Sequence, residues 1–257
     1  MSGPHISVVV NAHHEGLIAV PSIRSLALAA SYAARRGVRV ETIALLDCSN
    51  DLTADVFATH ADHRCEIVRV DIDDLGLCRN HGAQLARGDY VAFLDADDLW
   101  SENWLMEAFL AAEGDDRMVV WHPEANLYFG AATHSYRHVD MDSTEFDPLN
   151  LMITNYWTAL CFTRRTLVIE MPYRTTDLSS GIGYEDWSWN QEIIARGGMH
   201  KTVRGTAHGI RVRQRSLLRM TMAAASIPHP TDMYRNMLMR RLKSAATSIG
   251  NSQTHSS

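Results

Sequence analysis

The chain has 257 residues, enough for one large domain or two small ones, and its content of 46% hydrophobic and 21% charged residues is typical of a globular protein. A net charge of −6 provides no basic field for nucleic acid, so we predict no nucleic-acid partner. The longest apolar run, from Leu26 to Ala34, is too short to span a membrane and stops at Arg35. The four cysteines form no C-x-x-C pair, and the N-terminus has no signal-peptide pattern. We therefore predict a cytoplasmic chain with reduced thiols and no transmembrane segment.

The first half of the chain alternates strand and helix patterns. Continuous apolar runs, beginning with the β-branched ISVVV, predict buried strands of a parallel sheet. The predicted strands cover residues 6–10, 38–46, 65–70, 90–94 and 118–121, and the predicted helices cover 20–36, 52–60, 77–86 and 102–112. Repeated strand–helix units of this kind indicate a doubly wound α/β sheet. No G-x-G-x-x-G follows the first strand and no P-loop sequence occurs, so an ordinary dinucleotide or P-loop site is not predicted.

The rhythm breaks after Glu124. Residues 126–149 show no clear period and predict loops and irregular strands, whereas 187–196 predict a helix that Gly197 and Gly198 end. Residues 201–219 are basic and partly alternating, and 233–243 predict a short amphipathic helix. We predict an α/β half over 1–122, a second half of the same domain over 123–246, and a disordered tail over 247–257.

The stretch YVAFLDADDLW combines a buried strand with three carboxylates directly after it. Because side chains alternate along an extended chain, Asp95 and Asp97 are expected on the same side. Crowded carboxylates favour a divalent cation with oxygen ligands, and Mg²⁺ of this kind completes its shell with water and substrate phosphates. The pattern therefore indicates a metal–phosphate site at the carboxyl end of a strand. The alternative is a polar turn before the helix that begins near Glu102, where acids are also favoured.

Four segments in the right order resemble a known family. They read ISVVVNAHHEG, ALLDCSNDLT, LGLCRNHGAQLARGDYVAFLDADDLW and GIGYEDWSWNQEIIARGG, and the region that they span, from about Ile6 to Gly198, covers most of the chain. The sequence resembles the family 2 glycosyltransferases, inverting enzymes that use nucleotide sugars. The resemblance implies the GT-A fold, which is a Rossmann-like, mostly parallel sheet flanked by helices, with a smaller acceptor-side region. Asn11-Ala12-His13-His14 departs from the Pro-Thr-Tyr-Asn type of sequence common in the family at this place, which concerns recognition of the base.

The resemblance assigns the first strands to the nucleotide. Asp47, at the end of the second strand, is expected to accept from the base imide, which favours a donor of the uracil or thymine type. The alternative for Asp47 is a helix cap or a turn. Ala12, His13 and Glu15 are expected to contact the base and ribose, and the alternative is a solvated loop.

The R-N-x-G sequence is expected to approach the same nucleotide. By resemblance Arg79 lies near the nucleotide, whose charge a guanidinium matches. Its alternative is a surface arginine paired with Asp73 or Asp74, whereas Asn80 is expected to cap or brace the sheet.

The D-x-D sequence is expected to hold Mn²⁺ or Mg²⁺. Asp97 is the first choice for direct ligation, with Asp95 on the ribose, the metal or a metal-bound water, and Asp98 in a lesser role. His208 is a further candidate for the metal or the phosphate. The metal would neutralise the departing diphosphate.

The E-D-W sequence lies where a glycine-containing loop enters a helix. An inverting transfer needs one general base for the acceptor hydroxyl. A carboxylate at a helix N-terminus is held deprotonated by the helix dipole, and the resemblance favours Asp186 as that base, with Glu185 binding donor or acceptor. The alternative is simple N-capping. Trp187 and Trp189 are predicted core residues, with sugar stacking on Trp157 or Trp187 as the alternative.

The basic segment 201–219 has two interpretations. Alternation places Arg211, Arg213 and Arg215 on one face, either as a lid that closes on the diphosphate or as a solvated charged face. Further basic residues in the last predicted helix suggest contact with acidic lipid or an ordinary charged face. These residues are Arg235, Arg240, Arg241 and Lys243.

These assignments predict transfer of a sugar from a nucleoside-diphosphate sugar to a hydroxyl on a glycan, a lipid-linked molecule or a small molecule. The alternatives are a non-catalytic nucleotide-binding protein of the same fold and a phosphatase-type hydrolase with a D-x-D sequence. The hydrolase is disfavoured because its motif belongs on the first strand, and here it follows the fourth. The sequence makes no prediction of the oligomeric state.

Overall fold

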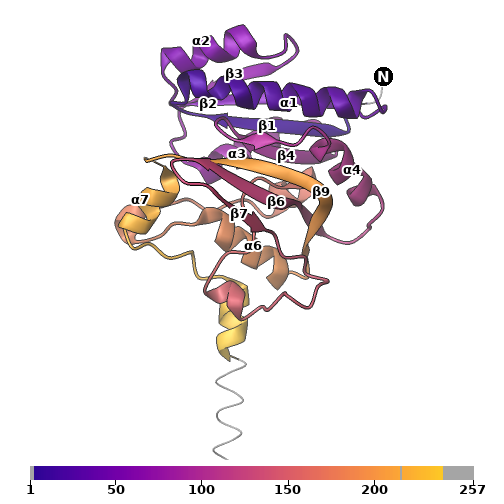
Figure 1. The fold of residues 1–257 in the computed structure, drawn as a ribbon. Coiled ribbons are helices and arrows are strands. Elements are labelled where there is room, and N and C mark those ends of the chain that lie inside the picture. Colours follow the sequence, from indigo (N-terminus) through magenta and orange to yellow (C-terminus); the bar gives the residue numbers. More distant parts are fainter. Residues whose placement is uncertain (1–2, 215, 240–257) are drawn as a thin grey trace, which may run out of the picture.

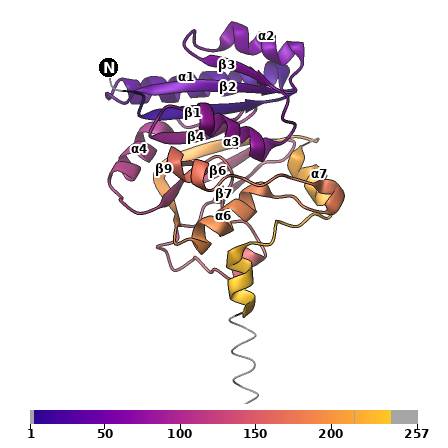
Figure 2. The same ribbon diagram turned by 180° about the vertical axis from the view of Figure 1, so that it is seen from behind.

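The computed structural model describes residues 3–214 and 216–239. Within them, a mixed sheet lies between layers of helices (Figures 1 and 2). The strands are β1 (Ile6–Ala12), β2 (Val40–Asp47), β3 (Glu66–Val70), β4 (Tyr90–Asp95), β5 (Leu99–Trp100), β6 (Val119–Gly130), β7 (His134–Arg137), β8 (Phe162–Arg164) and β9 (Met199–Val212). The helices are α1 (Ala19–Ala34), α2 (Asp51–His60), α3 (Leu75–Leu85), α4 (Trp104–Glu113), α5 (Arg165–Glu170), α6 (Glu185–Ala195) and α7 (Leu217–Ala223), with 3₁₀ turns η1 (Gly16–Ile18), η2 (Asn150–Met152) and η3 (Leu178–Ser180).

The strand order is β3-β2-β1-β4-β8-β6-β9-β5, with β7 paired to β6. The first four strands are parallel, β8 is antiparallel to both of its neighbours, and β6 and β9 are parallel. The predicted fold class, a mostly parallel sheet flanked by helices, is confirmed. The strand β6 crosses residue 122 and pairs with β9 along most of its length, so the two predicted halves share one sheet.

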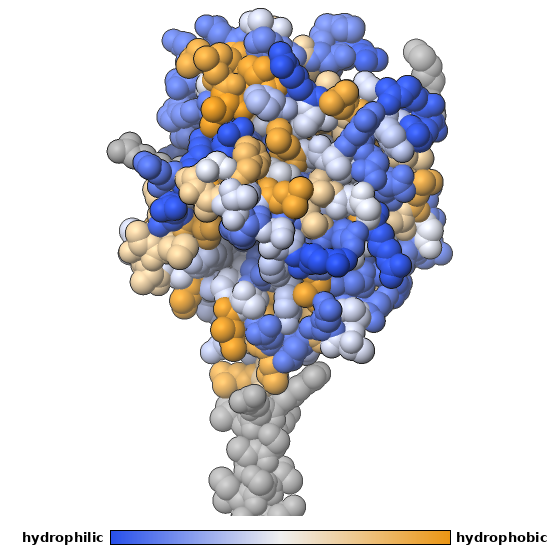
Figure 3. Space-filling model, viewed as in Figure 1, coloured by the Kyte–Doolittle hydropathy of each residue, from blue (hydrophilic) through white to orange (hydrophobic). Residues whose placement is uncertain are grey.

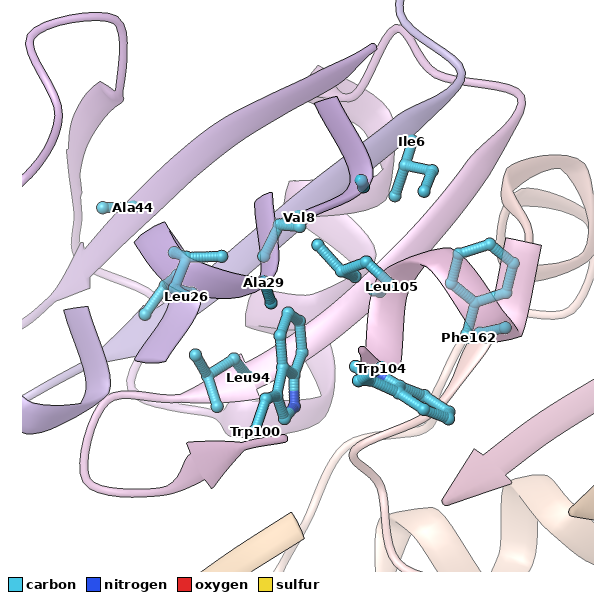
Figure 4. Close-up of a cluster of buried hydrophobic side chains, with 14 of the residues drawn as sticks. Ile6, Val8, Leu26, Ala29, Ala44, Leu94, Trp100, Trp104, Leu105 and Phe162 are labelled. Carbon is cyan, nitrogen blue, oxygen red and sulfur yellow. The ribbon is translucent and has the colours of Figure 1, made fainter. Parts of the chain in front are cut away.

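Alternation along the strands separates two hydrophobic clusters. On β1, Val8 and Val10 belong to the cluster under α1, α2 and α4, which Figure 4 shows, whereas Val9 belongs to the cluster with α3, α5 and α6. Trp104 of α4 and Phe162 of β8 are fully buried in the first cluster. The apolar runs found in the sequence therefore form the middle layer of a three-layer arrangement. The carboxyl ends of these strands lie at the edge of the sheet where ligands bind in open α/β folds.

The helix α3 lies unusually close to the sheet. A Cβ atom at Gly82 would stand 2.4 Å from Val9 Cγ1, so only glycine fits there without a shift. The Asn80 side chain pairs with the backbone of Tyr173 in both directions, donating to its carbonyl at 2.9 Å and accepting from its N–H at 2.8 Å. Asn80 therefore acts as a brace, although its partner is the segment after α5 rather than the sheet. The R-N-x-G sequence fixes α3 against two layers at once.

The segment 201–219 differs from the predicted lid. Residues up to Val212 form β9, which pairs with β6 along most of its length and with β5 at His208 and Gly209, so this part of the segment is held within the sheet. The helix α7 follows and exposes Leu218, Met220 and Met222. The side of the molecule where α7 lies in Figure 1 has a pale orange area in Figure 3. The predicted helix 233–243 is helical over 232–239, and its remainder and the predicted tail lie outside the described residues.

One stretch among the described residues, Gly16–Ala34, is long and apolar enough to match a membrane span by length and composition alone. This measure also selects core helices of folded domains. The helix α1 contributes Ile23, Leu26 and Ala29 to the core cluster of β1 and β4, so this stretch has a packing role within the domain.

Candidate functional site

Three carboxylates gather where β4 ends. Asp95 is the last residue of β4 and is paired in register with Asn11 of β1, while Leu99 of β5 pairs with β9. The short connection between β4 and β5 buries the carboxylates of Asp97 and Asp98, and the Asp98 Oδ1 accepts from the Arg211 backbone N–H at 2.7 Å. The ends of β1, β4 and β9 therefore converge on this acidic turn.

Arg213 bridges Asp97 of the acidic turn and Glu15 of the loop after β1. Its Nε lies 2.7 Å from Asp97 Oδ2, off the line of the N–H bond, and its Nη2 lies 3.3 Å from Glu15 Oε1. Glu15 also accepts from the His13 backbone N–H at 2.6 Å. The loop after β1, the acidic turn and the end of β9 are thereby joined through a single guanidinium group.

A second arginine, Arg79 of α3, bridges another pair of acids. It is buried, its Nη1 donates to Glu185 Oε1 at 2.8 Å, and its Nη2 lies 3.4 Å from Asp95 Oδ1. Burial alone lowers the pKa of Arg79, but the two carboxylates outweigh this effect and raise it. The alternative for Arg79, a surface pairing with Asp73 or Asp74, is wrong. Arg79 instead connects the D-x-D sequence with the E-D-W sequence.

The E-D-W sequence opens α6 after a strained turn. Tyr184 has a φ of 55°, a left-handed conformation that is uncommon outside glycine and is retained where surrounding contacts enforce it. Gly76 of α3 permits the close approach of Glu185, because a Cβ there would stand 3.1 Å from Glu185 Cγ. Asp186 Oδ1 accepts from the Trp187 backbone N–H at 2.8 Å, and Asp186 Oδ2 accepts from Asn155 at 3.2 Å.

Burial and neighbouring charge shift the pKa values of these acids. Burial, followed by the charge of Glu185, raises the pKa of Asp186 to about 7, although Arg79 opposes the shift. Burial also raises the pKa of Asp97 to about 6, against the effect of Arg213, and raises that of Asp98 well above its ordinary range. Strongly perturbed carboxyl groups of this kind are typical of functional sites.

The donor set at the acidic turn fits a hard divalent cation. The available groups are carboxylate oxygens, and burial followed by the charge of neighbouring carboxylates raises the pKa values of Asp97 and Asp98, an effect that a bound cation would oppose. Among the described residues no three acid, histidine or cysteine side chains form a closed metal cage. An open site with one or two protein ligands, completed by water and phosphate, is the arrangement that Mg²⁺ commonly adopts.

The predicted base-binding residues lie together at the carboxyl ends of the neighbouring strands β1 and β2. The His13 Nδ1 is 2.6 Å from the Asp47 backbone carbonyl and therefore carries a proton. Asp47 Oδ1 accepts from the backbone N–H groups of Ile72 and Asp73 at 2.7 and 3.1 Å, so this carboxylate also shapes the turn after β3. Ala12 is buried at the end of β1.

Two predicted contacts lie elsewhere. The His208 ring is fully buried and packs 4.8 Å from the ring of Trp104 and 5.9 Å from that of Trp100, centroid to centroid, so the structure does not bring it to the acidic turn. Its assignment as a metal ligand is therefore withdrawn. Trp157 is also buried and stacks on His200 at 4.1 Å, so a sugar has no access to its ring. Trp189 is a core residue as predicted.

Three residues at the site were not selected from the sequence. Asn11 is buried beside Asp95 with both side-chain polar atoms unpaired among the described residues. Arg213 was noticed only as one of three alternating arginines, and Asn155 lies in an irregular segment without periodicity. A sequence signal existed for Asn11 alone, since it ends a strand beside the predicted loop of Ala12 and His13.

The layered sheet, with acids at the carboxyl ends of its strands, defines an α/β protein of the GT-A fold. Solved structures show the same fold. The chain is similar to S. aureus TarS 1-349 in complex with UDP-GlcNAc, with a TM-score of 0.63 and 14% identity over 93% of this chain and 72% of that one. It is also similar to the mannosyltransferase PcManGT from Pyrobaculum calidifontis in complex with GDP-Man and Mn²⁺, with a TM-score of 0.61 and 16% identity over 87% of this chain and 62% of that one.

The family model for glycosyl transferase family 2 matches residues 7–171, and the chain belongs to that family. Curated relatives include the succinoglycan biosynthesis protein ExoO of Rhizobium meliloti, 34% identical over 37% of this chain and 26% of its own length. Another is the amylovoran biosynthesis glycosyltransferase AmsB of Erwinia amylovora, 44% identical over 17% of this chain and 16% of its own length. The matches span between 16% and 27% of the length of these curated relatives.

Proposed function

We propose that the chain transfers a sugar from a nucleoside-diphosphate sugar to a hydroxyl group with inversion at the anomeric carbon. The observation that carries the proposal is the Arg79 bridge, which joins Asp95 at the acidic turn to Glu185 beside Asp186. Asp95, which is proposed to lie near the cation and the ribose, is thus connected through one buried arginine to the start of the helix that carries Asp186. Membership of family 2 and the sugar nucleotides bound by TarS and PcManGT support this reading over a hydrolase.

In the proposed reaction, the acceptor oxygen attacks the anomeric carbon opposite the departing diphosphate. The bond from that carbon to the diphosphate oxygen breaks, and the Asp186 carboxylate takes the hydroxyl proton. Asp186 suits this role because burial raises its pKa to about 7, which makes its carboxylate a stronger base than an ordinary aspartate. Glu185 stays paired to Arg79 and positions the helix start, with donor or acceptor contacts as its proposed further role.

We assign Asp97, with Asp95, to a divalent cation, Mn²⁺ or Mg²⁺. Such a cation supplies Lewis-acid neutralisation of the negative charge on the leaving diphosphate. On the base side, Asp47 is the proposed acceptor for the imide of a uracil or thymine base. The described backbone hydrogen bonds of its carboxylate fall on Oδ1, which supports a role for Oδ2 toward the donor. His13, Glu15 and Ala12 complete the proposed base and ribose contacts.

The first experiment is a thermal-shift screen of UDP, TDP, GDP and ADP, each with and without Mn²⁺. We expect Mn²⁺-dependent stabilisation that is greatest for UDP or TDP, because binding only the folded state raises the melting temperature. Asp55→Asn is a matched control, since Asp55 is an exposed acid of α2 away from the acidic turn. A selective response to GDP or ADP would contradict the role of Asp47, and NMR of the product's anomeric centre would contradict inversion if the configuration were retained.

A further inference from the structure

Asn155, in the loop after η2, contacts Asp186, the candidate base of the E-D-W sequence. The Asn155 Nδ2 donates to Asp186 Oδ2 at 3.2 Å, and the Asn155 Oδ1 accepts from Asn190 Nδ2 at 3.1 Å. Asp186 and Asn190 are one turn apart on α6, so they project from the same face of the helix. A single amide side chain therefore spans this face and closes on the carboxylate.

The orientation of the Asn155 amide is fixed by its surroundings. The Trp157 backbone N–H also points to Asn155 Oδ1, at 3.4 Å, so two donors converge on this end of the side chain. In the flipped orientation the Asn155 NH₂ group would face these two donors and its carbonyl would face the Asp186 carboxylate, and both contacts would be repulsive. The hydrogen-bonding environment thus assigns the carbonyl to Asn190 and Trp157, and the NH₂ group to Asp186.

The loop itself is held firmly against α6. The Leu151 carbonyl accepts from the Trp187 indole N–H at 2.8 Å and from the Gln191 side chain at 3.1 Å. Leu151 is fully buried, and Trp157 is nearly so. A side chain that must hold a base in place needs a rigid support, and these contacts provide one on both sides of Asn155.

We propose that Asn155 is a positioning residue for the reaction assigned to Asp186: its amide N–H orients the carboxylate and stabilises its charged form. The inference rests on the proposed function. The Trp187 backbone N–H holds the other carboxylate oxygen, Oδ1, so the two contacts together fix the plane of the carboxylate. A carboxylate that accepts hydrogen bonds is stabilised in its ionised form, and this opposes the effect of burial.

Several other groups act on the charge of Asp186, and a test must separate them from Asn155. Glu185 raises the pKa of Asp186, and Arg79 of α3 lowers it. The neutral groups whose own pKa values respond to the charge of Asp186 are Tyr128 of β6, Cys161 beside β8 and Tyr173 after α5. None of these three is a direct hydrogen-bond partner of Asp186 among the described residues.

The experiment titrates the Asp186 carboxyl by ¹³C NMR in protein labelled at aspartate Cγ, with the signal assigned by its loss in Asp186→Asn. In Asn155→Ala we expect the pKa of Asp186 to rise by about one unit, because the charged form loses a donor. Asn150→Ala is the matched control. Asn150 lies at the start of the same loop and donates to the Tyr156 hydroxyl at 2.9 Å, without touching Asp186. Its titration should equal that of the wild type.

Asn155→Asp is the second variant and is nearly isosteric, so it tests the contact if Asn155→Ala does not fold. It places a like charge at the same distance and should raise the pKa of Asp186 further than Asn155→Ala does. A folded variant of either kind with an unchanged Asp186 titration overturns the proposal.

The titration needs neither donor nor acceptor, so its outcome is separate from that of the proposed function. In transfer assays, the acidic limb of the pH–rate profile should move by the same amount as the NMR pKa, and Asn155→Ala should regain activity at high pH. Loss of activity at every pH, with no shift of the limb, would indicate a purely structural role and overturn the positioning role. Near-normal transfer by Asp186→Asn would instead remove Asp186 as the base while leaving the measured contact intact.

Discussion

The Arg213 Nε lies 2.7 Å from Asp97 Oδ2, and the same guanidinium reaches Glu15 on the loop after β1. A positive group thus stands among the acids proposed to receive a divalent cation. Both carboxylates are largely buried, and the Arg213 side chain is about one-third exposed, with an exposed fraction of 34%. We expect Arg213 to balance the acidic turn in the cation-free protein and to leave Asp97 when a cation binds.

Removing the charge of Arg213 should therefore strengthen cation binding. In Arg213→Met, without nucleotide, Mn²⁺ should bind several-fold more tightly, because an ion pair no longer competes for Asp97. Arg213→Lys keeps the charge and is the control, with an affinity close to that of the wild type. Titration calorimetry or the EPR signal of free Mn²⁺ measures the affinity. Equal or weaker Mn²⁺ binding by Arg213→Met would show that Arg213 does not compete for the site.

Asp97 should be required for cation-dependent nucleotide binding. Calorimetry of Asp97→Ala with UDP and Mn²⁺ should show at least a tenfold loss of affinity, roughly the loss of one charge-assisted ligand. The affinity for UDP without Mn²⁺ should change less, since Asp97 repels the diphosphate in that state. The control is Asp115→Ala, an acid that pairs with Arg117 outside the site. Unchanged affinity and metal dependence in Asp97→Ala would exclude it as a ligand.

Arg79 should contribute more to stability than an ordinary arginine. It is 1% exposed and pairs with Glu185 and Asp95, so Arg79→Met leaves a buried carboxylate without its cation. Breaking a buried pair in this way costs about 3–5 kcal/mol of unfolding free energy. Arg35→Met is the control, because Arg35 and its partner Glu102 are both exposed, and it should change stability by less than about 1 kcal/mol. Urea unfolding measures both, and similar losses in the two variants would contradict the buried role.

The same arginine shows what the sequence alone predicts and what it does not. The buried strand 90–94 and the acids after it are visible locally, because length, apolar content and alternation lie within a few residues. The environment of Arg79 depends on Glu185, 106 residues away, so the sequence indicated only an approach to the nucleotide or, as the alternative, a surface pairing. Its burial follows from tertiary packing that no local pattern contains.

The assignment of His208 was wrong and Asn155 was not selected, for related reasons. The basic alternation of 201–219 suggested a lid or a solvated face, yet the residues up to Val212 form β9 between β6 and β5, and Trp100 and Trp104 pack on His208. Asn155 precedes Tyr156 and Trp157 in an irregular segment and has no periodic signal. Its partner Asp186 was identified through the E-D-W sequence. The contact of Asn155 with Asp186 joins residues 31 positions apart, so only the three-dimensional structure reveals it.

Four buried histidines among the described residues should make the fold sensitive to acid. Burial lowers the pKa of His138 to about 4 and that of His200 to about 3, and it lowers the pKa values of His122 and His208 well below the ordinary value. The unfolded chain binds protons at these positions below a pH of about 6.5, whereas the folded chain does not. Their contribution to stability is therefore present above that pH and is lost as the pH falls toward 4.

The raised pKa values of Asp97, Asp98 and Asp186 act in the opposite direction, since their folded forms bind protons before the unfolded chain does. A difference between variants separates the two effects. In His138→Gln, the fall of unfolding free energy between pH 6 and pH 4 should be shallower than in the wild type, by at most about 1.4 kcal/mol per pH unit. Parallel pH dependences would show that His138 is not held neutral.

The last prediction separates the roles of the two neighbouring acids, Asp186 and Glu185. Asp186→Asn keeps the size of the side chain, and its amide oxygen still accepts from Asn155, but it removes basicity. Transfer should fall by about 10²-fold or more, with nucleotide affinity nearly unchanged. Because the folded pKa of Asp186 is raised to about 7, its charged form costs stability as the pH rises through that value. At pH 8 the Asn variant should thus melt at the same temperature as the wild type or higher.

Glu185→Gln should show the reverse pattern. It leaves the buried Arg79 short of one carboxylate, so we expect a lower melting temperature together with a smaller loss of transfer than in Asp186→Asn. Single-turnover transfer, calorimetry with UDP and Mn²⁺, and thermal unfolding at pH 6 and pH 8 measure the two variants side by side. If Glu185→Gln lost transfer while Asp186→Asn kept it, the base would be Glu185, and the Arg79 bridge would act on the base itself rather than on its neighbour.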